Sequence, residues 1–326
     1  MKTRIALWDN LKFVLILLVV VGHFSGFFQG ESNAYRSIFL FIYAFHMPLF
    51  LFVSGLFHKD EKISQKCLFY ISVGFFQKIV FFITNLVIGE KPKFVLLGDN
   101  GIPWFMFVLA IYTAIAYLLR EQNKLYIFVL AIILACFVGY DTSIGDYLYL
   151  SRAIIFFPFY LSGVIINKKD IQKIKEKHKI PLLVSSLIII LWLYICIAKL
   201  DIFYEMEPLF TGRNPFTQDI YYIGPFLRII CYGITFLTGA AVIFLVPSRK
   251  IRCISAMGGR SIDVYFWHWV VYLLLEKFLH IKQIFLWGTQ GKVLFLLIAV
   301  AVTIVLSLGG IISYPLNFVK KCCYKK

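Results

Sequence analysis

Two apolar stretches near the start of the chain decide the fold: residues 4–26 read RIALWDNLKFVLILLVVVGHFSG and residues 43–57 read YAFHMPLFLFVSGLF. Each belongs to an apolar run near the length of about 20 residues that a helix needs to cross the hydrocarbon layer of a bilayer. An ionisable side chain inside such a helix costs at least about 2.5 kcal/mol on insertion scales, so it marks a functional site by default. Lys12, His23 and His46 are therefore the first candidate site residues.

The whole chain has the composition of a membrane protein. Of its 326 residues 60% are hydrophobic and the mean hydropathy is +0.82, whereas soluble proteins are about 45–50% apolar. Apolar windows between polar breaks predict an all-α bundle of about ten transmembrane helices, in a single domain over residues 1–326 without a separate soluble domain. The expected helices are 11–29, 37–57, 68–88, 103–119, 125–140, 152–166, 180–199, 220–246, 262–280 and 292–313.

Lysines and arginines predict the orientation of these helices. The two ends of the chain and the connections after the second, fourth, sixth and eighth expected helices hold 21 of the 33 basic residues, and the opposite connections hold 9. Because short cytoplasmic loops are enriched in Lys and Arg, both termini are expected in the cytoplasm. The formal charge of +16 does not indicate nucleic acid, since the basic residues are spread over short loops rather than gathered on one soluble face.

Lys12 and His23 project from one face of the first expected helix. They are eleven residues apart, within about 20° of three full turns, and Asp9 joins the same stripe. His23 then lies about 16 Å from Lys12 along the axis, at a depth that His46 reaches from the antiparallel second helix. Pro48 leaves a helical carbonyl without its donor, so a kink with a freed polar group is expected beside His46. The plain alternatives are histidines hydrogen-bonded between helices and a lysine that snorkels to the membrane interface.

The later helices add four candidates. Ser261, Tyr265 and His268 are spaced to share one face of the ninth expected helix, where Ser261 also suits an N-cap and the Tyr265 hydroxyl can bond His268 or a ligand. Arg228, inside the eighth expected helix, must find an anion, a carbonyl or water. Two interpretations stay open for it: an ion pair with a buried acid such as Asp263, or contact with a phosphate or carboxylate of a substrate.

Other familiar chemistry is missing from the sequence. It has no phosphate-cradling glycine loop, no zinc-spaced set of Cys or His and no Gly-x-Ser-x-Gly elbow, so no metal and no permanently bound cofactor are expected. Trp104, directly after Pro103, is expected in the aromatic belt at the membrane interface.

Several of these motifs recur together in one known family. They are WDNLK at 8–12 with His23 after ten intervening residues, FHMPLF at 45–50 and SG at 54–55, followed by the weaker blocks PWF at 103–105, PFYLSG at 158–163 and SIDVY at 261–265. In this combination the chain resembles the acyltransferase-3 family of bacterial integral-membrane acyltransferases over nearly its whole length.

The resemblance implies transfer of an acyl group, usually acetyl, from cytoplasmic acyl-CoA to a hydroxyl of a carbohydrate or glycolipid acceptor, in the bacterial plasma membrane. The functional basic residue and histidine of the family's first helix correspond to Lys12 and His23. Many members carry arginine in place of Lys12, and arginine pairs where this chain has Lys59 and Lys62. His23 is then expected to act as general base or acyl relay beside His46.

The other candidates take supporting places in this interpretation. Lys12 and Arg228 are expected to bind the anionic donor, and Asp9, Ser261, Tyr265 and His268 to support the site. Two different functions remain open: a transporter or flippase for a polysaccharide or lipid-linked sugar, and a membrane component of polysaccharide biosynthesis with no catalytic activity of its own.

Overall fold

The computed structural model describes residues 5–98, 101–177 and 180–324, and the regular elements among these residues are all helices. The prediction of an all-α fold is therefore confirmed. Some basic residues that entered the orientation count, such as Lys2 and Lys179, lie outside the described residues.

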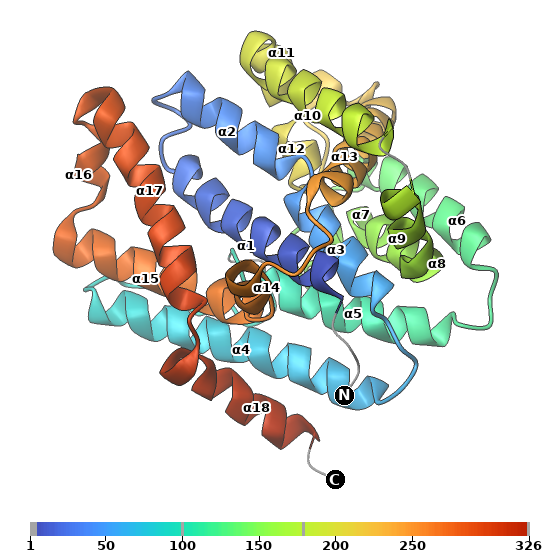
Figure 1. Ribbon diagram of the computed structural model, residues 1–326, viewed down its shortest axis with the longest axis horizontal. Coiled ribbons are helices and arrows are strands. Elements are labelled where there is room, and N and C mark those ends of the chain that lie inside the picture. Colours follow the sequence, from blue (N-terminus) through green and yellow to red (C-terminus); the bar gives the residue numbers. More distant parts are fainter. Residues whose placement is uncertain (1–4, 99–100, 178–179, 325–326) are drawn as a thin grey trace.

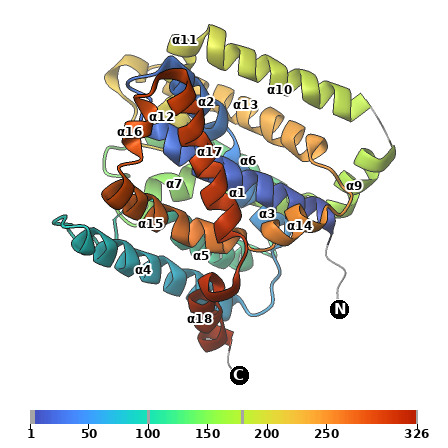
Figure 2. The same cartoon turned by 60° about the vertical axis from the view of Figure 1, so that its left-hand side comes forward.

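Figures 1 and 2 show the arrangement of the helices. The longer ones are α1 (Ala6–Gly26), α2 (Asn33–Tyr43), α3 (His46–Leu56), α4 (Ile63–Val87), α5 (Trp104–Leu118), α6 (Lys124–Phe137), α8 (Phe157–Ile165), α9 (Lys168–Lys177), α10 (Ile180–Ala198), α13 (Gly224–Leu245), α15 (Ser261–Leu279), α17 (Gly288–Leu306) and α18 (Tyr314–Tyr324). The shorter ones are α7 (Leu150–Ile155), α11 (Leu200–Tyr204), α12 (Glu207–Phe210), α14 (Arg252–Gly258) and α16 (Lys282–Phe285), with single 3-10 turns at Val138–Tyr140, Gln218–Ile220 and Gly310–Ser313.

Within the described residues six helical segments are long and apolar enough to cross a membrane: α1, α2 with α3, α4, α10, α13 and α17. A seventh is reached if α7 and α8 are joined to α9 across a 75° bend. The expected spans 103–119 and 125–140 form the shorter helices α5 and α6, and the span 262–280 forms α15, which includes Asp263 and Glu276. The chain is thus a multi-pass membrane protein, but ten spans are not confirmed.

The first helix lies at the centre of the bundle. In its apolar window 67% of the residues are buried, against 17% in α10, which lies at the outer edge in Figures 1 and 2. α1 packs against α2, α3, α14, α15 and α17. A polar side chain on α1 is therefore surrounded by protein, while most of α10 is left to face lipid.

The expected kink at Pro48 is confirmed. One apolar run divides into α2 and α3 at Ala44 and Phe45, because Pro48 has no N–H to donate to the carbonyl of Ala44. That carbonyl instead accepts a hydrogen bond of 2.6 Å from the hydroxyl of Thr235 on α13. The break starts α3 at His46 and fixes the direction of its side chain.

Two of the small-residue motifs meet where α3 crosses α8. A Cβ atom built on Gly55 would lie 2.0 Å from the carbonyl oxygen of Tyr160, and one built on Gly163 would lie 2.0 Å from that of Phe52. Only glycine fits at either position, and the close approach of the two backbones is typical of helices packed in a membrane. The crossing holds α3 against the part of the chain that carries α7.

The connections between helices gather at two ends of the bundle. In Figure 1 the turns from α3 to α4 and from α5 to α6 lie toward the right, whereas those from α4 to α5 and from α15 to α16 lie toward the left. This alternation agrees with helices that run back and forth across a layer. Which end faces the cytoplasm stays a prediction.

Cysteine labelling in intact cells tests that orientation. In a background without the exposed Cys253 and Cys322, Lys173→Cys is expected to be protected from an impermeant thiol reagent and Thr217→Cys to react with it. The reason is the excess of basic residues on the side of α9. Permeabilised cells, in which both positions label, are the control. The reverse pattern in intact cells contradicts the predicted orientation.

Candidate active site

Aromatic rings surround His23 near the C-terminal end of α1. Its imidazole stacks on His268 of α15 with ring centroids 5.3 Å apart and meets Trp269 edge to face at 5.7 Å. On the other side the Tyr43 hydroxyl lies 3.4 Å from Nδ1 of His23, and the Tyr43 ring meets that of His46 at 4.7 Å. His23 and His46 thus share Tyr43 as a contact, and His268 joins them from a third element.

Main-chain carbonyls fix the rings of the other two histidines. Nδ1 of His46 lies 2.9 Å from the carbonyl oxygen of Ile42, and Nδ1 of His268 lies 2.9 Å from that of Val264 and 3.0 Å from that of Tyr265. A carbonyl only accepts, so both rings carry a proton on Nδ1 and Nε2 is left as the acceptor. Nε2 of His268 is buried and has no hydrogen-bond partner among the described residues.

His23 opens into a cavity of about 390 Å³, the histidine cavity. Its volume is within the usual range for small-ligand sites, about 300–1,000 Å³. Its aromatic lining includes Trp104 and Trp269. The ionisable and amide side chains that line it are His23, Gln29, Tyr43, His46, Arg152, Glu207, Arg213 and Tyr265. Apolar rings with a few converging polar groups are the usual composition of a small-molecule site.

A second cavity of about 270 Å³, the lysine cavity, lies at the opposite end of α1. It is lined by Lys12 together with Ser54, Phe57, Tyr70 and Ser261. The Lys12 ammonium lies 3.6 Å from the carboxylate of Asp9 and 5.3 Å from the centre of the Phe57 ring. Asp9 is buried and Lys12 lines the cavity, so the ion pair holds a cation at the cavity wall.

The two cavities share the side chains of Val19, Met47 and Tyr265 as lining residues. Tyr265 was expected to bond His268 or a ligand through its hydroxyl, which instead donates to the carbonyl of Ile102 at 2.6 Å. The backbone oxygen of Tyr265 accepts a hydrogen bond from Nδ1 of His268. The ring is therefore a fixed part of the wall that the two cavities share.

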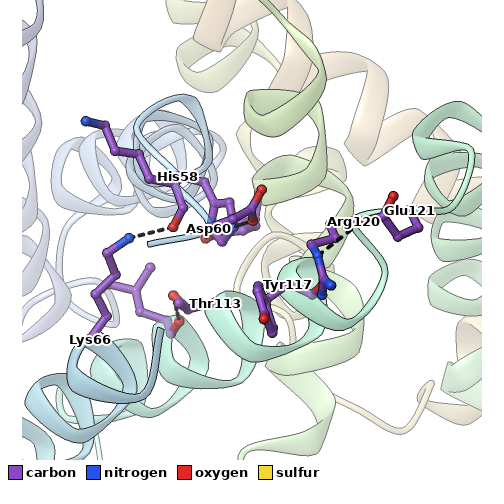
Figure 3. Close-up of polar contacts among 10 residues, drawn as sticks. His58, Asp60, Lys66, Thr113, Tyr117, Arg120 and Glu121 are labelled. Carbon is purple, nitrogen blue, oxygen red and sulfur yellow. Dashed lines mark hydrogen bonds and ion pairs between the residues drawn. The ribbon is translucent and has the colours of Figure 1, made fainter. Parts of the chain in front are cut away.

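A polar connection joins α3 to α4 directly after Phe57, which lines the lysine cavity, and Figure 3 shows its side chains. His58 contacts the Tyr160 hydroxyl through Nδ1 at 2.8 Å and Asp60 through Nε2 at 3.1 Å, and Lys66 donates to the carbonyl of Lys59 at 2.6 Å. Burial lowers the pKa of His58, although Asp60 acts in the opposite direction. Lys59, one of the two lysines expected in place of family arginines, is exposed and does not line the cavity.

Arg228 lines neither cavity, and its expected contact with the donor stays a prediction. The alternative, an ion pair with Asp263, is wrong, because Arg228 donates to Asn214 and Asp263 accepts from the hydroxyl of Ser313. The Arg228 guanidinium donates to Asn214 at 3.1 Å and lies over the ring of Phe216, 5.2 Å from its centre. Arg228 therefore supports the loop that follows α12.

Two plainer expectations are also corrected. Ser261 is the first residue of α15 rather than its cap; Arg260 precedes it, and no side chain caps that end. Trp104 is buried and lines the histidine cavity instead of lying in an interfacial belt. Inside the protein its ring lies 4.8 Å from the guanidinium of Arg152.

Sequence reasoning missed three charged residues of the histidine cavity: Arg152, Glu207 and Arg213. In the sequence Arg152 and Arg213 contribute only to the count of basic residues that predicts the orientation, and Glu207 lies in a connection that carries no recognisable motif. Burial raises the pKa of Glu207, although the nearby charges of Arg213 and Arg152 act in the opposite direction. A charge beside a run of apolar neighbours is the one signal in the sequence that could have found these residues. Of the three, Arg152 alone lies beside such a run.

These features define a class: a multi-pass membrane protein whose central helix places a lysine cavity and a histidine cavity along one face. Residues 5–312 match the family model of acyltransferase-3, described as an acyltransferase domain. The chain therefore belongs to the acyltransferase-3 family, and membrane acyl transfer is its class of activity. Comparisons with curated proteins and with solved structures gave no match.

Proposed function

We propose that the protein transfers an acetyl or similar acyl group from cytoplasmic acyl-CoA to a hydroxyl of a cell-surface carbohydrate or glycolipid precursor, in the bacterial plasma membrane. The observation that carries the proposal is the placement of Lys12 and His23 in adjoining cavities on the central helix. Family membership supports the transfer of an acyl group.

The lysine cavity is the proposed donor site. CoA is a polyanion, and a lysine is a point charge suited to phosphate. Lys12 lies at the end of α1 that is expected to face the cytoplasm, where acyl-CoA is available. A thioester arm that passes Val19, Met47 and Tyr265 would bring its carbonyl toward His23.

The histidine cavity is the proposed place of reaction. His23 as general base takes the proton of the acceptor hydroxyl, whose oxygen attacks the thioester carbonyl; the carbon–sulfur bond breaks, and the departing CoA thiolate takes up the proton that the His23 imidazolium releases. As an acyl relay, His23 would attack the thioester carbonyl itself and release CoA, and the acceptor oxygen would then take the acyl group as the bond between carbonyl carbon and imidazole breaks. The ring of His268, fixed through its Nδ1, keeps the His23 imidazole in place by stacking.

Purified protein in nanodiscs separates the enzyme from the two alternatives. With acetyl-CoA and a mixture of glycans, the proposal expects release of free CoA thiol that depends on acceptor, together with O-acetylated product detected by mass spectrometry. A glycan flux in proteoliposomes that persists without acyl-CoA, with no acetylated product, would indicate a transporter. No thiol release and no flux would indicate a non-catalytic component.

A further inference from the structure

The last residue of α2 contacts histidines of two other helices. Tyr43 lines the histidine cavity, and its hydroxyl lies 3.4 Å from Nδ1 of His23 on α1. Its ring meets that of His46, the first residue of α3, at a centroid distance of 4.7 Å. The structure thus places a phenol hydroxyl at one of the two ring nitrogens of His23.

Packing fixes the Tyr43 ring against α1. The ring stacks on that of Phe39, one turn earlier in α2, with centroids 3.7 Å apart. It also lies close to Gly22, the residue before His23, because a Cβ atom built there would come within 3.1 Å of Cε2 of Tyr43. Moving the ring would lose these contacts, so the position of the hydroxyl is set before a substrate binds.

The Tyr43 contact differs in kind from the other contacts of the His23 ring. His268 stacks on the imidazole with a centroid distance of 5.3 Å, and Trp269 meets it edge to face at 5.7 Å. Ring contacts of this type restrain the plane of an imidazole, but they do not determine which nitrogen carries its proton. The Tyr43 hydroxyl meets one particular nitrogen and can determine this.

Two arrangements of the protons are possible at this contact, and one of them lets His23 react. A neutral imidazole carries a proton on one nitrogen and a lone pair on the other. If the hydroxyl donated to Nδ1, Nε2 would carry the proton and could neither accept another nor attack a carbonyl. If Nδ1–H donates to the Tyr43 oxygen, the lone pair is on Nε2, which is the arrangement that main-chain carbonyls impose on His46 and His268.

We propose that Tyr43 is a positioning residue for His23: its hydroxyl oxygen accepts the hydrogen bond of Nδ1–H and so leaves Nε2 as the reacting nitrogen. As general base, Nε2 takes the proton of the acceptor hydroxyl and later gives it to the departing thiolate, while the Nδ1 proton stays on its bond to Tyr43. As acyl relay, Nε2 forms the bond to the carbonyl carbon with Nδ1–H in the same place. The inference rests on the proposed function and specifies how its central histidine is oriented.

Tyr43→Phe tests the inference, because it keeps the ring and its packing and removes only the hydroxyl. With the full chain in nanodiscs, acetyl-CoA and the mixture of glycans are varied in turn, and free CoA thiol is measured. We expect kcat to fall about tenfold, the effect of a hydrogen bond lost from an imidazole that becomes charged during the reaction. The KM for acetyl-CoA and the apparent KM for the glycans should stay nearly unchanged, since the hydroxyl acts on His23 and not on either substrate.

Tyr35→Phe is the matched control on the same helix. The Tyr35 hydroxyl donates to the carbonyl of Lys292 at 2.7 Å, and Tyr35 does not line the histidine cavity. This variant loses a hydrogen bond of the same type and should keep the wild-type kcat. An unchanged kcat in Tyr43→Phe, an equal fall in both variants, or a rise confined to the apparent KM for the glycans overturns the inference and leaves the proposed function standing. No transfer by the wild-type protein overturns both.

Nitrogen NMR of isotopically labelled histidine reads the position of the proton without any substrate. The signals of His23 are those that His23→Ala lacks. At a pH at which the imidazole is neutral, we expect the proton of His23 on Nδ1 in the wild type and a mixture of both tautomers in Tyr43→Phe. A wild-type His23 with its proton on Nε2 contradicts the assignment.

Discussion

His23→Ala is expected to abolish acyl transfer while the protein still inserts and folds. Removal of a general acid or base costs about 10²–10⁴ in rate, and loss of an acyl relay costs at least as much, because the covalent route disappears. Insertion should not suffer, since alanine enters a membrane helix more easily than an imidazole. Initial rates of acetyl-CoA consumption in the presence of acceptor measure the effect.

The matched control is His280→Asn. His280 is exposed at the end of α15 and adopts a left-handed φ of 49°, a conformation that asparagine tolerates. This variant should keep the wild-type rate. Thermal unfolding of both variants should separate loss of chemistry from loss of folded protein. If well-folded His23→Ala forms product at the normal rate, the general base and the acyl relay are both excluded for His23.

The local chemistry of the sequence was sufficient to predict the break beside His46. Proline lacks an N–H wherever it occurs, so the kink at Pro48 follows from the residue alone. The hydrogen-bond partner of the freed carbonyl of Ala44 could not be predicted in the same way. Thr235 is 191 residues further along the chain, and no periodicity within either segment indicates that α3 and α13 meet there.

The alignment of Lys12 and Asp9 could also be predicted, because helical geometry fixes which side chains share a face within one element. The structure pairs them at 3.6 Å. His268 was assigned to a face of its own helix but not to His23, since the stacking of these rings depends on how α15 crosses α1. Interhelical contacts of this kind arise from packing between elements that local patterns do not describe.

Arginine is where sequence reasoning failed most clearly. Arg228 lies deep in an apolar helix and was therefore chosen, yet it supports a loop; Arg152 lies at the edge of a short helix and was passed over, yet it lines the cavity. A charge deep in an apolar run must be compensated by some partner. For Arg228 an asparagine side chain and an aromatic ring contribute to that compensation, and a ligand is not required for it. Depth in the run does not indicate what provides the compensation.

Lys12→Gln is expected to weaken the binding of the acyl-CoA donor rather than to slow the chemical step. The CoA phosphates lie far from the thioester carbonyl, so a lysine that binds them contributes to affinity for acyl-CoA and not to the attack on the carbonyl. A lost charge-assisted contact is worth about 1.5–3 kcal/mol, which raises the KM for acyl-CoA about ten- to a hundredfold. The KM for acceptor should stay nearly unchanged, and Lys12→Arg should retain much of the activity, because it keeps the charge and adds a two-pronged phosphate contact.

The ion pair with Asp9 requires its own control, since Lys12→Gln leaves a buried carboxylate without its cation. Asp9→Asn/Lys12→Gln removes both charges and should restore folding without restoring donor affinity. Lys173→Gln, with a side chain 70% exposed on α9, should leave the KM for acyl-CoA within about twofold of wild type if binding depends on the cavity rather than on general basic charge. Should the single variant lose kcat with an unchanged KM for acyl-CoA, Lys12 acts on the reaction itself, through the helix face that it shares with His23.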